Sequence, residues 1–288
     1  YGERTNTRIY CGIIADNTYL YLGTDNGILV YNYRTDKYEQ PDTDFPTDVR
    51  TMVLQGDTLW IGSLNGLYTY QLKSRQLNHF DSKQTGLPHN TIYSIIHTKD
   101  NQIYIGTYNG LCRYVQASGK FENILLPVNR GGSNLFVNSL LEDTTRQCIW
   151  IGMEGYLFQY NPTIGEMKAI EVFHNNSIKS LALDGDENLL AGTDNGLYVY
   201  QNDKEPLQHI IHDSRNIQSL TNNIIWNIFS DQEHNIWLGT DYGISLSRYN
   251  SALQFVPISQ ITGTGDGNQF YSLFRDSKGF YWFGGTNG

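Results

Sequence analysis

A short pattern recurs along this chain and limits its possible folds more than any other feature of the sequence. The segment YLYLGTDNGILVY at 19–31 returns as LWIGSLNGLYTY, IYIGTYNGLCRY, IWIGMEGYLFQY, LLAGTDNGLYVY and IWLGTDYGISLSRY, and YWFGGTNG is a seventh copy. One glycine marks the same place in each copy: Gly23, Gly62, Gly106, Gly152, Gly192, Gly239 and Gly284. Successive glycines are 39 to 47 residues apart, which is the length of one four-stranded β-propeller blade.

Each repeat divides into four short segments with the alternation and the β-branched or aromatic content of strands. In the third repeat these segments are TIYSII, QIYIGT, GLCRY and KFENIL. Separate sheets of this kind expose both faces, whereas blades stacked around an axis bury them. The sequence therefore predicts an all-β fold, a seven-bladed β-propeller of four-stranded blades. We expect one domain over 1–288, with the last blade truncated, as a fragment of a longer multidomain protein.

Composition and charge argue against several classes of partner. The net charge is −9 and the pI is about 5.2, and no run of lysines and arginines offers the positive surface that nucleic acid requires. No apolar stretch approaches the roughly 20 residues that span a bilayer, so we expect no direct membrane contact. The three cysteines, Cys11, Cys112 and Cys148, form no CxxC pair, and we expect Cys112 and Cys148 to be buried thiols.

The first segment of each repeat contains one position that varies freely, followed by a small residue. The variable residues are Cys11, Arg50, Tyr93, Asn138, Lys179, Trp226 and Tyr271, and the small ones are Gly12, Thr51, Ser94, Ser139, Ser180, Asn227 and Ser272. A position that changes among cation, amide and aromatic is expected to face a cavity, because packing would hold it constant.

These residues suggest a ligand-binding site. Aromatic rings stack on sugars, and cations and amides hydrogen-bond to hydroxyl or carboxylate groups. The candidate binding residues are Arg50, Tyr93, Asn138, Lys179, Trp226 and Tyr271, with the loop residue Arg130. The alternative is that these side chains fill gaps between blades or bind water.

Signatures of catalysis and of metal binding are missing or weak. The sequence has no GxSxG, HExxH or P-loop motif, so we assign no catalytic residue and no cofactor. Asp184, Asp186 and Asn188 are spaced as in a calcium loop, but the later glutamate is missing and we expect no metal site. Aspartates that end the first segment of other repeats are expected to cap turns in the same way: Asp16, Asp143, Asp231 and Asp276.

The segments WIGSLNGLYTY and WLGTDYGI, each preceded by a strand such as NNIIWNIFSD, and the final WFGGTNG resemble the two-component regulator propeller repeat. The resemblance covers nearly the whole chain. It implies the sensor region of a Bacteroidetes hybrid two-component system with histidine kinase and response regulator domains. Such a region is periplasmic, in a protein anchored in the inner membrane. It would detect an oligosaccharide and regulate glycan-use genes through domains outside this sequence, so the fragment itself is expected not to be an enzyme.

Two other functions stay open at this point. A protein-interaction or dimerisation scaffold is compatible with apolar loop residues such as Leu135 and Phe136, which we expect to be exposed. A propeller lyase would need a general base, for which His89 and His174 are the candidates. For a sensor, the expected partners are an oligosaccharide, a neighbouring propeller or sandwich domain of the same chain, and a possible second copy. A neutral oligosaccharide is favoured by the net charge, although Arg50, Arg130 and Lys179 leave an acidic one open.

Overall fold

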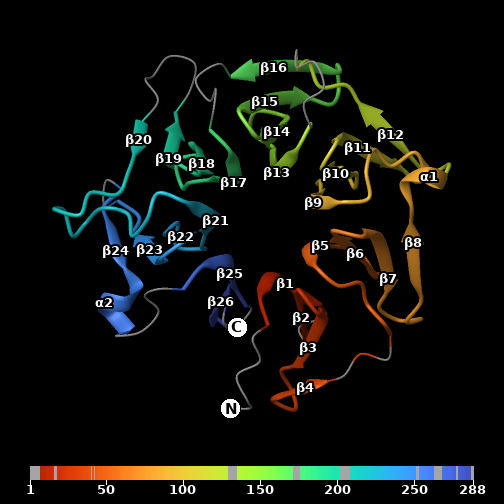
Figure 1. Ribbon diagram of the computed structural model, residues 1–288, viewed down its shortest axis with the longest axis horizontal. Coiled ribbons are helices and arrows are strands. Elements are labelled where there is room, and N and C mark those ends of the chain that lie inside the picture. The colour runs from red at the N-terminus through yellow and green to blue at the C-terminus, as the bar shows by residue number, and fades with distance from the viewer. Residues whose placement is uncertain are drawn as a thin grey trace. The chain divides into compact units, whose positions relative to one another are not determined.

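The computed structural model describes residues 7–15, 18–39, 41, 43–128, 135–170, 176–201, 208–250, 253–262, 268–276 and 278–286. The chain divides into two compact units. The N-terminal unit comprises 9–154 and 158–169, and the C-terminal unit comprises 1–8, 155–157 and 170–288. The described residues form six four-stranded antiparallel sheets and one two-stranded sheet, labelled in Figure 1.

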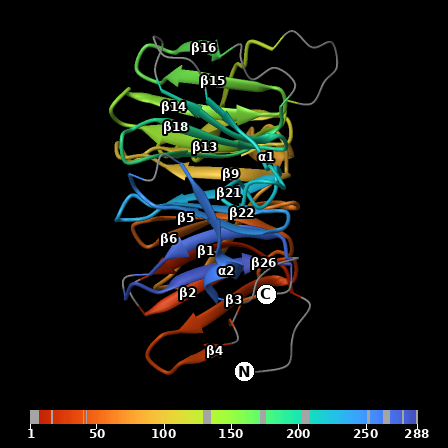
Figure 2. The same ribbon diagram turned by 90° about the vertical axis from the view of Figure 1, so that its left-hand side faces the viewer.

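The first four sheets follow the first four repeats. Their strands are β1 (Ile9–Ala15), β2 (Tyr19–Thr24), β3 (Gly27–Asn32) and β4 (Lys37–Glu39); β5 (Val49–Gln55), β6 (Thr58–Ser63), β7 (Gly66–Gln71) and β8 (Leu77–Phe80); β9 (Ile92–His97), β10 (Ile103–Thr107), β11 (Gly110–Val115) and β12 (Lys120–Ile124); and β13 (Val137–Asp143), β14 (Cys148–Met153), β15 (Tyr156–Asn161) and β16 (Glu166–Ile170). A short helix, α1 (Ser82–Thr85), follows β8. Strands pair in chain order within each sheet, as Figure 2 shows for β1 to β4. The first strands β1, β5, β9 and β13 contact one another in sequence.

The C-terminal unit continues the same plan. Its strands are β17 (Ile178–Leu183), β18 (Leu189–Thr193), β19 (Gly196–Tyr200) and β20 (Gln208–Ile210); β21 (Ile225–Ser230), β22 (Ile236–Thr240), β23 (Gly243–Ser247) and β24 (Phe255–Pro257), followed by α2 (Ile258–Thr262); and β25 (Phe270–Arg275) with β26 (Tyr281–Gly285). The described residues form six four-stranded blades rather than the seven blades predicted, and the seventh copy contributes only the two strands β25 and β26, in line with the predicted truncation of the last blade.

The glycine that marks each repeat lies in the second strand of its sheet, opposite the first strand. A side chain here would collide with the next sheet. A Cβ added at Gly106 would come within 2.6 Å of Val137 Cγ1, and one added at Gly239 would come within 2.6 Å of the Phe270 carbonyl oxygen. Only glycine allows consecutive sheets to approach this closely, so the periodic glycine is a packing requirement of the blades.

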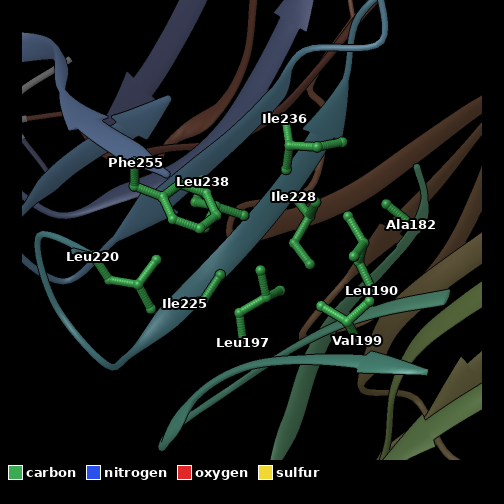
Figure 3. Close-up of a cluster of buried hydrophobic side chains, with 10 residues drawn as sticks. All are labelled: Ala182, Leu190, Leu197, Val199, Leu220, Ile225, Ile228, Ile236, Leu238 and Phe255. Carbon is green, nitrogen blue, oxygen red and sulfur yellow. The ribbon is translucent and has the colours of Figure 1, made fainter. Parts of the chain in front are cut away.

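Apolar side chains fill the space between sheets. In the C-terminal unit, one cluster packs sheet β17–β20 against sheet β21–β24 (Figure 3). Its buried members are Ala182, Leu190, Leu197, Val199, Leu220, Ile225, Ile228, Ile236, Leu238 and Phe255. Cys112 and Cys148, in the N-terminal unit, are buried as predicted, and burial raises the pKa of both thiols.

Aspartates after the first strand join this packing to the turns. Asp143, Asp231 and Asp276 accept backbone N–H groups of the turns that follow them, which confirms the predicted caps. Each also accepts the indole N–H of a second-strand tryptophan of its own sheet, at 2.8 to 3.0 Å. Asp16 lies outside the described residues. One carboxylate therefore fixes both the turn and the large indole ring.

Candidate ligand-binding site

The variable position of each repeat is the site of a β-bulge. In sheet β5–β8, Val49 pairs with Ser63 and Thr51 with Gly62, so the register skips Arg50. The same shift occurs in the other first strands at Tyr93, Asn138, Lys179, Trp226 and Tyr271. A bulge takes a residue out of the ladder and re-aims its side chain. The position varies because cross-strand packing does not restrict it.

The first repeat requires a correction. Ile9 pairs with Thr24 and Cys11 with Gly23, so the register skips Tyr10. Tyr10 is therefore the bulge residue and Cys11 takes the small position, one residue earlier than the sequence comparison placed them. An aromatic residue followed by a small one also occurs at Tyr93 and Tyr271, and this signal would have identified Tyr10.

The bulges of the first three sheets bring together the Arg50 cluster, which we define as Tyr10, Asp48, Arg50, Tyr93 and Phe136. The guanidinium carbon of Arg50 lies 3.8 Å from the centre of the Tyr10 ring, and its Nη2 atom is 3.4 Å from Asp48 Oδ1. The Tyr93 ring packs edge-on against Phe136 at 4.3 Å. Burial raises the pKa of Tyr93, and the positive charge of Arg50 opposes that rise. The cluster holds a half-buried cation among aromatic rings.

The C-terminal unit has a second group, the Trp226 cluster, which consists of Lys179, Trp226, Asp241, Gln269 and Tyr271. Trp226 Nε1 and Gln269 Nε2 both donate to Asp241 Oδ1, at 3.0 and 2.6 Å. The Tyr271 hydroxyl donates to Gln269 Oε1 at 2.5 Å. The ammonium nitrogen of Lys179 lies 4.5 Å above the Trp226 ring, and the Trp226 and Tyr271 rings meet edge-on at 5.5 Å. Sequence comparison found the three bulge residues but not Asp241 or Gln269 as members of the site.

The remaining predicted residues have different positions. Asn138 is half-buried at the bulge of β13. Arg130 and His174 lie outside the described residues. His89 accepts the Thr91 N–H through Nδ1 at 3.0 Å, so this nitrogen caps a turn.

Two further expectations concern the loops. Leu135 and Phe136 are half-buried rather than exposed, because Phe136 packs on Tyr93 and on Tyr108. The expected apolar patch for a partner protein is therefore not formed by these two residues. Asp184 accepts the N–H groups of Asp186 and Asn188 at 2.9 and 2.8 Å, which makes it a turn cap.

Across the described ranges, no helix is long and apolar enough to cross a membrane.

Comparison with known proteins gives a consistent picture. The two-component regulator propeller family matches residues 86–109, 219–242 and 264–287. Two solved structures of one B. thetaiotaomicron protein are 82% identical with a TM-score of 0.84 and cover 99% of this chain and 38% of theirs. They are described as the extracellular domain of a one-component system and of a hybrid two-component system.

Two further proteins are similar to this chain at lower sequence identity. Histidine kinase P4 of Formosa agariphila is 26% identical over 161 residues, which are 50% of this chain and 11% of the kinase. Virginiamycin B lyase of Staphylococcus aureus is 14% identical with a TM-score of 0.73, covering 98% of this chain and 93% of the lyase. The lyase shares the propeller fold alone. The chain spans little more than a third of the solved B. thetaiotaomicron extracellular domain and about a tenth of the kinase.

Proposed function

The chain belongs to the two-component regulator propeller family, and we propose that it is part of the ligand-binding sensor region of a hybrid two-component system. The extracellular domain that is 82% identical supports this role. It also supports a periplasmic location, with signalling through kinase and regulator domains elsewhere in the protein. We take β25 and β26 as the first half of a seventh blade.

The bulge residues carry the proposal for the binding site. They recur at the same register position in each repeat, yet their side chains are cations, aromatics and an amide. A repeated scaffold that displays changing side chains at one position is suited to recognising a ligand with several different groups.

We propose that the ligand is an oligosaccharide. Aromatic rings such as Trp226 and Tyr271 offer apolar faces for sugar rings, while Asp241 and Gln269 offer acceptors and donors for hydroxyl groups. The hydrogen bonds among these side chains hold the polar groups in place before a ligand arrives, which lowers the entropic cost of binding. We propose no enzymatic activity for this part of the protein.

The test is a thermal-shift screen of the complete propeller against neutral and acidic oligosaccharides, because a ligand of the native state raises the melting temperature by mass action. We expect at least one oligosaccharide to raise Tm in a concentration-dependent way. Trp226→Ala is expected to abolish that rise.

The matched control is Phe280→Ala, which removes an aromatic side chain that is 63% exposed and lies in the turn before β26. This variant is expected to keep the ligand-induced rise. A screen without any stabilising oligosaccharide would contradict the sensor proposal, and equal loss in both variants would contradict the proposed position of the site.

A further inference from the structure

We propose that Arg50 binds the carboxylate of an acidic sugar on the ligand. This inference rests on the proposed sensor function and adds the chemical class of one ligand group. It departs from the neutral oligosaccharide that the net charge favours, because the immediate surroundings of a side chain, more than the charge of the whole chain, determine which ligand group that side chain binds.

The ion pair of Arg50 is loose in comparison with others in the molecule. Three other arginines, Arg113, Arg146 and Arg275, each approach a carboxylate oxygen at 2.7 Å. Arg50 approaches Asp48 at 3.4 Å, although its side chain is only 27% exposed. A half-buried guanidinium with so weak a counter-charge retains capacity for a second anion.

The hydrogen-bonding capacity of Arg50 is also unfilled. A guanidinium has five N–H donors, and Nε of Arg50 is buried with no hydrogen-bond acceptor in the described part of the chain. Buried donors are normally satisfied, so the guanidinium is short of one hydrogen bond at Nε, and its Nη groups are left to meet a ligand. The Tyr10 ring, 3.8 Å from the guanidinium carbon, holds the flat group by cation–π contact, so its donors are oriented in advance.

The other neighbours of Arg50 do not compensate its charge. Burial raises the pKa of the Cys11 thiol to about 12, and burial likewise raises that of Tyr93. Both groups are therefore neutral at physiological pH, which leaves Asp48 as the carboxylate in contact with Arg50 among the residues that the structure describes. A planar guanidinium matches a carboxylate with two parallel hydrogen bonds, and the aromatic rings of Tyr93 and Tyr10 suit the sugar ring that carries it.

The experiment measures binding of four probes to the complete propeller by calorimetry and by thermal shift at constant ionic strength. The probes are galacturonate, galactose 6-sulfate, galactose and sodium sulfate. We expect galacturonate to bind saturably and about tenfold or more tightly than galactose, since a charge-assisted bidentate pair is among the stronger contacts. Tighter binding of galactose 6-sulfate than of galacturonate would overturn the carboxylate, and equal binding of sodium sulfate would show that Arg50 holds any free anion.

Three variants locate the effect. Arg50→Gln is expected to weaken galacturonate binding about tenfold or more, and Arg50→Lys is expected to recover only part of it because lysine lacks the planar fork. Asp48→Asn removes the competing carboxylate and is expected to tighten galacturonate binding several-fold, an outcome that a purely structural role of Arg50 does not produce. The melting temperature of each unliganded variant shows whether it is folded.

The two proposals fail in different ways. Galacturonate affinity that is unchanged in Arg50→Gln, or absent in the wild type, overturns the carboxylate site. If neutral oligosaccharides still raise Tm in the same protein, the sensor proposal stands without it. If no sugar of either kind binds, both proposals are wrong.

Discussion

The Arg50 cluster and the Trp226 cluster occupy the same register position in their repeats but are held in different ways. In the Trp226 cluster, the tryptophan, a glutamine and a tyrosine are joined through hydrogen bonds to Asp241 and to one another. In the Arg50 cluster, the cation has a carboxylate 3.4 Å away and a buried Nε for which the described residues provide no acceptor. The polar side chains of the first cluster are tied to one another, whereas the second keeps, within the described part of the chain, one donor that has no acceptor.

The difference shows that the same β-bulge can present two kinds of side-chain surface. In both places the bulge removes the side chain from cross-strand packing. Whether that side chain is then held rigidly or keeps free hydrogen-bonding groups depends on its neighbours. A rigidly held side chain presents a shape to a ligand, whereas unused donors attract a particular charge. We expect the hydrogen-bonded Trp226 cluster to contribute to stability as well as to ligand binding, and the Arg50 cluster to select the charge of the ligand.

The largest expected effect concerns the glycines beneath the two clusters. Gly239→Ala would place its Cβ 2.6 Å from the Phe270 carbonyl oxygen, which is backbone and precedes Tyr271. Gly23→Ala would place its Cβ 2.5 Å from Cys11 Sγ and 2.7 Å from Val49 Cγ1, which are side-chain atoms, while the nearest backbone atom, the Val49 carbonyl oxygen, is 3.1 Å away. We expect about 3 kcal/mol of destabilisation for Gly239→Ala and about 1 kcal/mol for Gly23→Ala, measured by urea unfolding.

A double variant tests whether the cost of Gly23→Ala comes from the Cys11 side chain. Cys11→Ala removes the sulfur atom and is expected to reduce the cost of Gly23→Ala. No side-chain deletion offers the same relief at Gly239, because the atom in the way there is a carbonyl oxygen. Equal costs for the two glycine variants would show that the next sheet yields as readily at one cluster as at the other.

The second prediction compares the carboxylates. Asp241→Ala leaves Trp226 Nε1 and Gln269 Nε2 without their shared acceptor, and we expect a loss of about 2 kcal/mol in unfolding free energy. Asp48→Asn is expected to change stability by about 0.5 kcal/mol or less, because its ion pair is long and partly exposed. Asp241→Asn keeps an acceptor oxygen and should fall between them. A large loss from Asp48→Asn would mean that Arg50 is as firmly held as Trp226.

Much of the fold could be predicted from the sequence because the blade repeat is encoded locally. The glycine, the turn after it and the two strands that flank this turn lie within about 15 residues, and the copies repeat them. Turn caps such as Asp143 and Asp231 were predictable for the same reason, since a carboxylate beside a turn binds the N–H groups next to it.

The site was less predictable because its contacts join residues that are distant in sequence. Asp241 is 15 residues from Trp226 and 28 from Gln269, and no spacing rule links them. The bulge also escapes a period-two pattern, since one extra residue shifts the alternation. This is why the variable position of the first repeat was assigned to Cys11 and the small one to Gly12, each one residue too late. The predicted roles of Arg50, Lys179 and Trp226 in binding stay predictions.

The smallest expected effect tests the far ends of the same strands, where the two regions differ again. Sheets β5–β8 and β9–β12 are linked by neutral groups, with Gln55 Nε2 donating to Asn101 Oδ1 at 3.0 Å. Sheet β21–β24 and β25–β26 are linked by ionisable ones, with the Tyr281 hydroxyl donating to Asp231 Oδ2 at 2.8 Å. The contrast therefore predicts pH dependence at one link and not at the other.

Burial and the hydrogen bond to Asp231 raise the pKa of Tyr281 from 10.0 to about 12. The folded state thus favours the neutral phenol, so this contribution is complete below pH 10 and is lost as the pH rises toward 12. Tyr281→Phe is expected to cost about 1 kcal/mol at neutral pH and to flatten the alkaline fall in Tm. The control, Gln55→Ala, should lower Tm by the same amount across that range. If Tm of Tyr281→Phe fell with rising pH in parallel with Tm of the wild type, ionisation of the Tyr281 phenol would not be the cause of the alkaline loss of stability.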